Sequence, residues 1–274
     1  MSIHPSAIIG KNVILGKNVS VGPYVVIEGS VEIGEGTTIL AHAYITGWTK
    51  IGKNNRIHMG AILGHEPQDV AYKGTESYLV IGDNNTFREH SWIHRGTKEG
   101  SSTVIGNNNY FMGYAHAAHN CKVGNGAIVA SNTLLAGHVE VGDNAFISGN
   151  IVVHQFCRIG RLAMISGLSA VNKDVPPFVT AGGRGVVAIA PNVVGLRRAG
   201  LSLKERSAIK EAYRIVFRSG LNTKQALEEL RKGEPTKEVR EMIDFIASSK
   251  RGICNPSGQK HVNEDISGEG AGEE

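Results

Sequence analysis

Histidine is the residue type whose spacing in this chain most clearly suggests chemistry. One short segment places His116 and His119 three residues apart, and His138 and His154 follow farther along. A neutral imidazole is the usual general base near pH 7, so exposed histidines on neighbouring elements would suit proton abstraction from a substrate. A zinc site is the competing interpretation, because three imidazoles can form a hydrolytic centre. A surface role without chemistry is the third.

The elements that must position these histidines repeat every six residues. From Ile3 to Leu63 every sixth residue is isoleucine, leucine or valine, and the register returns after interruptions and continues to Val171. A helix repeats at 3.6 residues and a strand at 2, so neither holds a period of six. Hexapeptide repeats are the signature of a parallel β-solenoid. A β-sandwich of short strands is the alternative, but it has no reason to keep this phase.

The register also indicates which side chains point inward. Small or β-branched residues stand four positions after each anchor, as at Val19 and Val25, and form a second inward position. Glycine often follows the anchor, and asparagine or glycine stands two residues later, where a tight corner needs a positive φ. His116 precedes the anchor Ala117 and is expected to point outward, whereas His119 falls at a corner.

The repeat predicts a solenoid domain over residues 1–185 with two excursions, residues 64–78 and 97–102. Long excursions from a regular scaffold often carry function, although a surface loop without a role is the alternative, especially for the second. Val175-Pro176-Pro177 ends the repeat, because proline lacks the N–H that another coil would need.

A small α-helical domain is predicted over residues 186–252. Ser202 and Glu205 form a capping-box pattern before a helix that Gly220 would end. Further helices are predicted near residues 223–232 and 236–250, the second with Val239, Met242, Ile243 and Ile246 on one face. Residues 253–274 are polar and rich in glycine and glutamate, and are predicted to be a disordered tail.

Composition narrows the class of protein. The 29 basic and 25 acidic residues give no reason to expect nucleic acid, and no apolar stretch of about 20 residues is present to insert in a membrane. Three cysteines argue against a disulfide framework, and the N-terminus lacks a targeting pattern, so a cytoplasmic location is expected. Residues 196–252 hold 14 basic and 8 acidic groups, which concentrates positive charge after the solenoid.

Several segments carry a more specific signal than the repeat itself. They are Tyr114–Cys121, Leu134–His138, Val153–Cys157, Asp174–Pro177 and Asn192–Arg198, together with Pro67–Asp69 and Ile93–Gly96. In this order they closely resemble the UDP-N-acetylglucosamine acyltransferase family, over about residues 2–252. The resemblance implies a left-handed parallel β-helix of hexapeptide repeats with a C-terminal α-helical domain, assembled as a homotrimer with active sites between neighbouring subunits.

The resemblance also implies a reaction, the first step of lipid A synthesis. An (R)-3-hydroxyacyl group would move from acyl carrier protein to the glucosamine 3-hydroxyl of UDP-N-acetylglucosamine, with no metal and no cofactor. His119 would be the general base, and the backbone N–H of Gly137 would stabilise the tetrahedral oxyanion. Acyl carrier proteins are acidic, so residues 196–252 would attract them; an ordinary solvated helix surface is the alternative.

Further residues acquire expected roles in binding substrate. Gln68 and Asp69 would contact sugar and acyl groups. Asn192 and Arg198 would reach the nucleotide end of UDP-N-acetylglucosamine, where an arginine is well suited to bind phosphate. Gly167 would set the floor of the acyl pocket. The residues expected to line the substrate groove are His116, His138, His154 and Gln155.

Two positions depart from the family pattern. The family commonly has aspartate directly after the catalytic histidine, where this chain has Asn120. The family often has lysine two residues after the loop aspartate, where this chain has Ala71, with Lys73 nearby as a candidate substitute.

Four alternatives stay open from the sequence. The related N-acyltransferase usually carries an additional N-terminal uridine-binding domain, whereas this repeat starts at Ile3. A preference for a 3-amino sugar acceptor, an acetyltransferase using coenzyme A, and a non-catalytic solenoid scaffold are the others.

Overall fold

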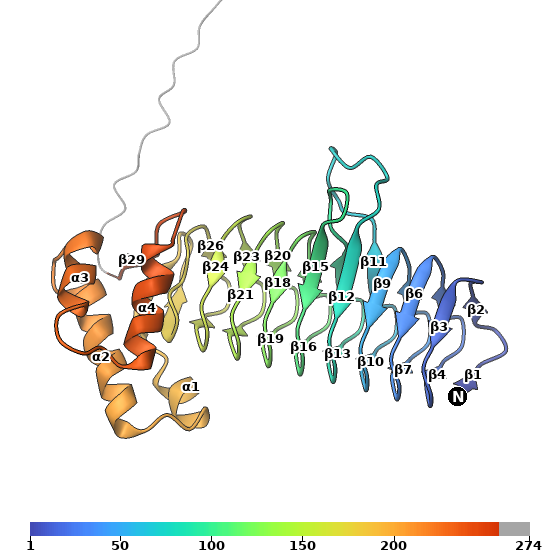
Figure 1. The fold of residues 1–274 in the computed structure, drawn as a ribbon, viewed down its shortest axis with the longest axis horizontal. Helices are drawn as coiled ribbons and strands as arrows, with labels where there is room; N and C mark the ends of the chain where they lie inside the picture. Colours follow the sequence, from blue (N-terminus) through green and yellow to red (C-terminus); the bar gives the residue numbers. More distant parts are fainter. Residues whose placement is uncertain (258–274) are drawn as a thin grey trace, which may run out of the picture.

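Parallel β-sheets run along the molecule and form the three faces of a left-handed β-helix, as predicted (Figure 1). The structure is a computed structural model that describes residues 1–257. Up to Val171 each strand pairs in parallel with the third strand along, as β1 (Ser2–Ile3) does with β4 (Ser20–Val21), so one coil takes three strands. The strands after residue 178 depart from this order, and one of their pairs is antiparallel.

The strands divide among the three faces as follows. In the described part of the chain, the first sheet continues with β7 (Thr38–Ile39), β10 (Arg56–Ile57), β13 (Thr86–Phe87), β16 (Tyr110–Phe111), β19 (Ile128–Val129), β22 (Phe146–Ile147), β25 (Met164–Ile165), β27 (Val179–Gly182), β28 (Val187–Pro191) and β29 (Asn255–Pro256). The second contains β2 (Ile8–Ile9), β5 (Val26–Ile27), β8 (Tyr44–Ile45), β11 (Ile62–His65), β14 (Trp92–His94), β17 (His116–Ala117), β20 (Leu134–Leu135), β23 (Val152–Val153) and β26 (Ala170–Val171). The third contains β3 (Val13–Leu15), β6 (Ser30–Ile33), β9 (Trp48–Ile51), β12 (Tyr78–Ile81), β15 (Ser102–Ile105), β18 (Lys122–Val123), β21 (Glu140–Val141) and β24 (Arg158–Ile159).

The anchors of the six-residue repeat form the core, as the register predicts. Ile27 and Ile45 are fully buried, and the rings of Phe87 and Phe111 stack with their centroids 5.3 Å apart. The first coil is the exception: Ile9 and Leu15 are only partly buried, and Ile3 has 42% of its surface exposed. This coil has a neighbouring coil on one side only.

The corners confirm the predicted role of asparagine and reveal bulkier residues in the same conformation. Asn18 and Asn54 have φ values of 57° and 53°. Tyr24, His42 and His138 also have positive φ, with 60° at His138, although such side chains rarely adopt this conformation. The His138 N–H donates to the His119 carbonyl 3.0 Å away, and this bond between coils helps to hold the corner.

Both excursions leave the solenoid on the same side (Figure 1). The first lies between β11 and β12, and the second lies between β14 and β15. Because β11, β14 and β17 are successive neighbours in the second sheet, the two excursions stand beside the coil that carries His119.

Helices cover the C-terminal end of the solenoid (Figure 1). They are α1 (Val193–Arg198), α2 (Leu203–Arg218), α3 (Thr223–Leu230) and α4 (Lys237–Ala247). The predicted capping box at Ser202 and Glu205 is confirmed, and the predicted apolar face of α4 is buried. No helix in the described residues is both long enough and apolar enough to cross a membrane.

The predicted start of the disordered tail is wrong for residues 253–257. Cys254 is 1% exposed, and its N–H donates to the Asp174 carbonyl 2.8 Å away. The following strand, β29, pairs with β28, so this segment is tied to the solenoid. The rest of the predicted tail, residues 258–274, lies outside the described residues. The domain division at residues 185 and 186 stays a prediction.

Candidate active site

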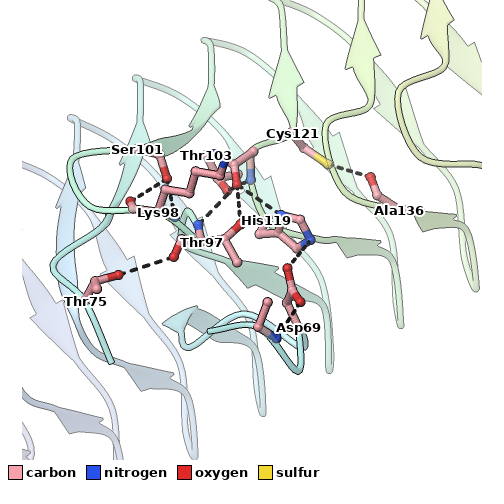
Figure 2. Close-up of polar contacts among 11 residues, drawn as sticks. Asp69, Thr75, Thr97, Lys98, Ser101, Thr103, His119, Cys121 and Ala136 are labelled. Atoms are coloured by element: carbon pink, nitrogen blue, oxygen red, sulfur yellow. Dashed lines mark hydrogen bonds and ion pairs between the residues drawn. The ribbon is translucent and has the colours of Figure 1, made fainter. Parts of the chain in front are cut away.

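His119 lies at the corner between β17 and β18, with its two ring nitrogens in different surroundings (Figure 2). Nδ1 is 2.8 Å from Thr97 Oγ1 and 3.0 Å from Asn120 Oδ1. Nε2 faces Asp69, whose Oδ2 lies 3.8 Å away. The side chain is 15% exposed, so one edge of the ring is held by the protein while the ring stays accessible.

Asp69 approaches His119 from the first excursion. Its Oδ1 accepts a hydrogen bond of 2.9 Å from the Ala71 N–H, which leaves Oδ2 turned toward the imidazole. The distance of 3.8 Å is too long for a hydrogen bond, but a carboxylate this close stabilises an imidazolium.

Arg95 anchors the first excursion from beneath. The residue is 8% exposed; Nη1 donates to the Gly64 carbonyl at 2.9 Å and Nη2 to Tyr72 Oη at 2.7 Å. The guanidinium also lies over the Trp48 and Tyr72 rings, 5.6 and 5.4 Å from their centroids. One buried cation therefore holds both the start and the middle of the segment that carries Asp69.

The two departures from the family pattern have different structural settings. Asn120 has φ of 60°, and its N–H donates to Thr103 Oγ1 at 2.8 Å. Its Oδ1 joins the His119 cluster, where a family member would place a carboxylate oxygen. Ala71 supplies a backbone N–H to Asp69, and among residues 1–257 the exposed Lys73 makes no polar contact with the cluster.

Gly137 and His138 pack against the other side of His119. A Cβ on Gly137 would lie 2.5 Å from His119 Cε1 and 2.6 Å from Nε2, so the ring occupies the space a side chain would need. The His138 ring meets His119 edge-on with centroids 5.3 Å apart and stacks on Phe156. Burial, with a contribution from His119, lowers the pKa of His138, which favours its neutral form.

His116 lies outside the core, as predicted, but is covered by neighbouring aromatic rings. Trp92 and His94 meet it edge-on, with centroids 5.9 and 5.1 Å away. Its Nε2 is buried and has no hydrogen-bond partner among residues 1–257. Burial is the main reason that the pKa of His116 falls to about 4, so the ring is neutral at pH 7.

An apolar groove runs from His116 across the second sheet. His154 lies on the same groove, whose other walls include Leu134, Val152 and Ala170. Gln155 is exposed at the next corner, beside His154. A Cβ on Gly167 would meet nothing closer than 3.5 Å, so a side chain at this position has room to project. The groove can accept a hydrocarbon chain.

The remaining predicted site residues do not meet His119 within one chain. Gln68 is exposed beside Asp69. Asn192 begins α1 as its N-cap, and its Nδ2 donates to the Leu162 carbonyl at 2.8 Å. Arg198 is exposed at the end of α1, and in the described part of the chain neither residue forms a hydrogen bond with the His119 cluster.

Residues 1–257 contain no group of side chains that matches the alternative of a zinc site. Nowhere in this part of the chain do three histidine, cysteine, aspartate or glutamate side chains converge as metal ligands.

Sequence reasoning missed Thr97 and Arg95, which organise the site. Arg95 belongs to the segment Ile93–Gly96, to which only the family resemblance drew attention, and Thr97 was noted only as the start of the predicted excursion over residues 97–102. The burial of Arg95, which is 8% exposed, is visible only in the structure, where a buried charge needs partners.

Two family models match parts of this chain. Residues 174–254 match a model described as UDP N-acetylglucosamine O-acyltransferase, domain 2. Residues 30–65 and 102–137 match bacterial transferase hexapeptide repeats.

Relatives match nearly the whole chain. An acyl-[acyl-carrier-protein]–UDP-N-acetylglucosamine O-acyltransferase from Syntrophobacter fumaroxidans is 43% identical over 256 residues, covering 92% of this chain and 99% of the relative. One from Halorhodospira halophila is 47% identical over 253 residues, covering 92% and 98%. The crystal structure of a UDP-N-acetylglucosamine O-acyltransferase from Moraxella catarrhalis is 43% identical with a TM-score of 0.90, covering 93% of this chain and all of that one.

Proposed function

Since the chain belongs to the UDP-N-acetylglucosamine O-acyltransferase family, we propose that it transfers an (R)-3-hydroxyacyl group from acyl carrier protein to the 3-hydroxyl of UDP-N-acetylglucosamine, starting lipid A synthesis. The observation that carries the assignment of the base is the setting of His119, held at Nδ1 and facing a carboxylate at Nε2. The N-acyltransferase alternative is not favoured, because relatives matching almost the whole chain are named O-acyltransferases.

His119 acts as the general base in this reaction. Its Nε2 removes the proton from the sugar 3-hydroxyl while that oxygen attacks the thioester carbonyl carbon. The tetrahedral intermediate then collapses, the carbon–sulfur bond breaks, and the imidazolium returns the proton to the departing thiolate. Asp69, whose Oδ2 lies 3.8 Å from Nε2, stabilises the positive charge between these two events.

The Gly137 N–H is the proposed donor to the oxyanion. Gly137 is buried against the Cε1–Nε2 edge of His119, which brings its backbone close to the reacting atoms. Among the hydrogen bonds of the described residues, none uses this N–H, so it is available for an oxygen on which charge develops.

The apolar groove is the proposed acyl site. His116, His138, His154 and Gln155 would line the path of the substrate from His119, and Gly167 would leave the far end open to a longer chain. Gln68, beside Asp69, would contact the sugar and acyl groups.

A homotrimer with active sites between subunits would complete the part of the substrate site that binds the nucleotide. Asn192 and Arg198 lie at the C-terminal end of the molecule, so a neighbouring copy would have to bring them to His119. Exposed apolar side chains on the second sheet support such contacts: Ile8 is 63% exposed, Val152 50% and Leu134 42%.

The charge of the helical domain supports the proposed acyl carrier protein partner, and the state of the cysteines supports the proposed cellular location. The excess of positive charge over residues 196–252 supports docking of the acidic acyl carrier protein on the helices. Cys121, Cys157 and Cys254 are buried free thiols, which fits a reducing compartment and supports a cytoplasmic location.

The test is acyl transfer from 3-hydroxyacyl carrier proteins of several chain lengths to UDP-N-acetylglucosamine. We expect turnover by the parent and a loss of at least about a hundredfold in folded His119→Ala, since general bases contribute roughly 10²–10⁴-fold. His4→Ala, which changes an exposed histidine on the first coil, is the control. Turnover only with the 3-amino sugar would overturn the acceptor, and full activity in His119→Ala would overturn the base.

A further inference from the structure

The oxygen of the Asn120 side chain can be identified from its donors. The backbone N–H of Thr97 donates to the Asn120 side-chain atom at 3.1 Å, and an amide nitrogen could not accept that bond. This atom is therefore Oδ1, and it can only accept hydrogen bonds.

The Thr97 hydroxyl and the His119 ring then have defined roles. Thr97 Oγ1 lies 2.7 Å from Asn120 Oδ1, so the hydroxyl proton points to that oxygen (Figure 2). His119 Nδ1 lies 2.8 Å from Thr97 Oγ1 and 3.0 Å from Asn120 Oδ1. An unprotonated Nδ1 would place its lone pair against the lone pairs of Oδ1. Nδ1 consequently carries the proton and donates it to this pair of oxygens.

We propose that Thr97 is a positioning residue for His119, which together with Asn120 holds the neutral ring in the tautomer with the proton on Nδ1. The lone pair then lies on Nε2, the atom that faces Asp69 and the accessible side of the site. The catalytic consequence of this tautomer rests on the proposed function, because it matters only if Nε2 takes the substrate proton.

Thr97 also compensates for the missing carboxylate after His119. An aspartate at position 120 would hold Nδ1–H through its charge, whereas the neutral Asn120 offers one oxygen that already accepts from Thr97 twice. The threonine hydroxyl gives Nδ1–H a second acceptor and, by donating to Oδ1, keeps that oxygen in place.

The test compares Thr97→Val, which removes the hydroxyl and keeps the β-branched shape, with Thr97→Ser, which keeps the hydroxyl. Thr75→Val is the matched control, because the Thr75 hydroxyl bonds to the Thr97 carbonyl at 3.3 Å without touching His119. We expect kcat to fall roughly tenfold in Thr97→Val with little change in the KM for the sugar nucleotide. A loss of this size is typical when a hydrogen bond that orients a functional histidine is removed. The kcat values of Thr97→Ser and Thr75→Val should stay within about twofold of the parent value.

A spectroscopic readout separates tautomer control from a structural role. In protein with ¹⁵N-labelled histidine, the His119 signals, assigned by their loss in His119→Ala, should report a protonated Nδ1 in the parent and a mixture of tautomers in Thr97→Val. An unchanged tautomer in folded Thr97→Val overturns the proposal, as does an equal loss of kcat in Thr97→Ser. Because this readout needs no turnover, it decides the role of Thr97 even if the proposed reaction fails.

A second background sharpens the test. Asn120→Asp supplies the charge that the family commonly has, so Nδ1–H should no longer depend on the threonine hydroxyl. We expect Thr97→Val to cost roughly tenfold in the parent and less than threefold in Asn120→Asp, a coupling typical of residues in one hydrogen-bond network. The same loss in both backgrounds would overturn the compensating role.

Discussion

His119 Nε2 and Asp69 Oδ2 lie 3.8 Å apart, although one belongs to a corner of the solenoid and the other to the excursion between β11 and β12. The gap is longer than a hydrogen bond, so the neutral imidazole keeps its Nε2 lone pair free for a substrate hydroxyl. It is short enough for the carboxylate to attract the imidazolium once that proton has been taken.

Asp69→Asn should therefore lower kcat by roughly ten- to a hundredfold, because a preorganised charge at the protonated base is lost. Steady-state kinetics with saturating donor would measure it. Glu76→Gln changes another carboxylate on the same excursion, one that bonds to the Tyr78 hydroxyl and does not touch His119, and should leave kcat unchanged. Equal kcat values in Asp69→Asn and the parent would contradict the role given to this carboxylate.

Gly137→Ala should lower kcat by a steric route. The new Cβ would lie 2.5 Å from His119 Cε1, closer than real contacts allow, so the ring must leave its position. We expect kcat to fall at least about a hundredfold, the range for a displaced catalytic group. Gly113→Ala is the matched control, since its Cβ would meet nothing closer than 3.5 Å. Retention of full activity by Gly137→Ala would contradict the tight packing of this glycine against the base.

The repeat could be predicted from sequence because each inward position follows from its neighbour six residues away. Ile27 and Ile45 are buried for the reason that the period gives, and Asn18 has the positive φ that a corner needs. His116 and His119 could be recognised as residues outside the core by the same register.

The contacts around His119 could not be predicted in this way, because they join excursions whose paths the repeat does not determine. Thr97 meets His119 from the start of the second excursion, and Asp69 arrives from the first. The positive φ of His138 was also missed, since the pattern favours asparagine or glycine at corners, and coil-to-coil bonds override that preference here.

Arg95→Met should release the first excursion. The variant loses two charge-assisted hydrogen bonds, to the Gly64 carbonyl and the Tyr72 hydroxyl, and leaves the buried carbonyl without that donor. We expect the free energy of unfolding to fall by about 3 kcal/mol and the sugar KM to rise, because Asp69 is no longer held. Thermal unfolding, kinetics and limited proteolysis near the exposed Lys73 would measure these effects.

Arg56→Met is the control for this prediction, because Arg56 is an exposed arginine on the first sheet, away from the excursion. Its stability and its cleavage pattern should match those of the parent. If the two variants were cleaved at the same rate near Lys73, the anchoring role of Arg95 would be wrong.

His116 should make the folded protein sensitive to mild acid. Burial lowers its pKa from 6.5 to about 4, so between these values the unfolded chain binds a proton that the folded chain does not. The free energy of unfolding therefore falls as the pH drops through this window, and the contribution is constant above and below it. The full effect of one such group is about 3 kcal/mol, of which about 2 kcal/mol is lost between pH 7 and pH 5.

His116→Phe removes the titrating group while keeping a ring beside Trp92 and His94. The difference in unfolding free energy between pH 7 and pH 5, measured by chemical denaturation, should shrink by about 2 kcal/mol in this variant. Part of the acid sensitivity should remain, because burial also lowers the pKa of His94. His154→Phe replaces an exposed histidine on the same groove and should leave the difference unchanged. An unaltered pH dependence in His116→Phe would mean that the imidazole gains a proton without disturbing its contacts, and that its burial does not favour the neutral ring.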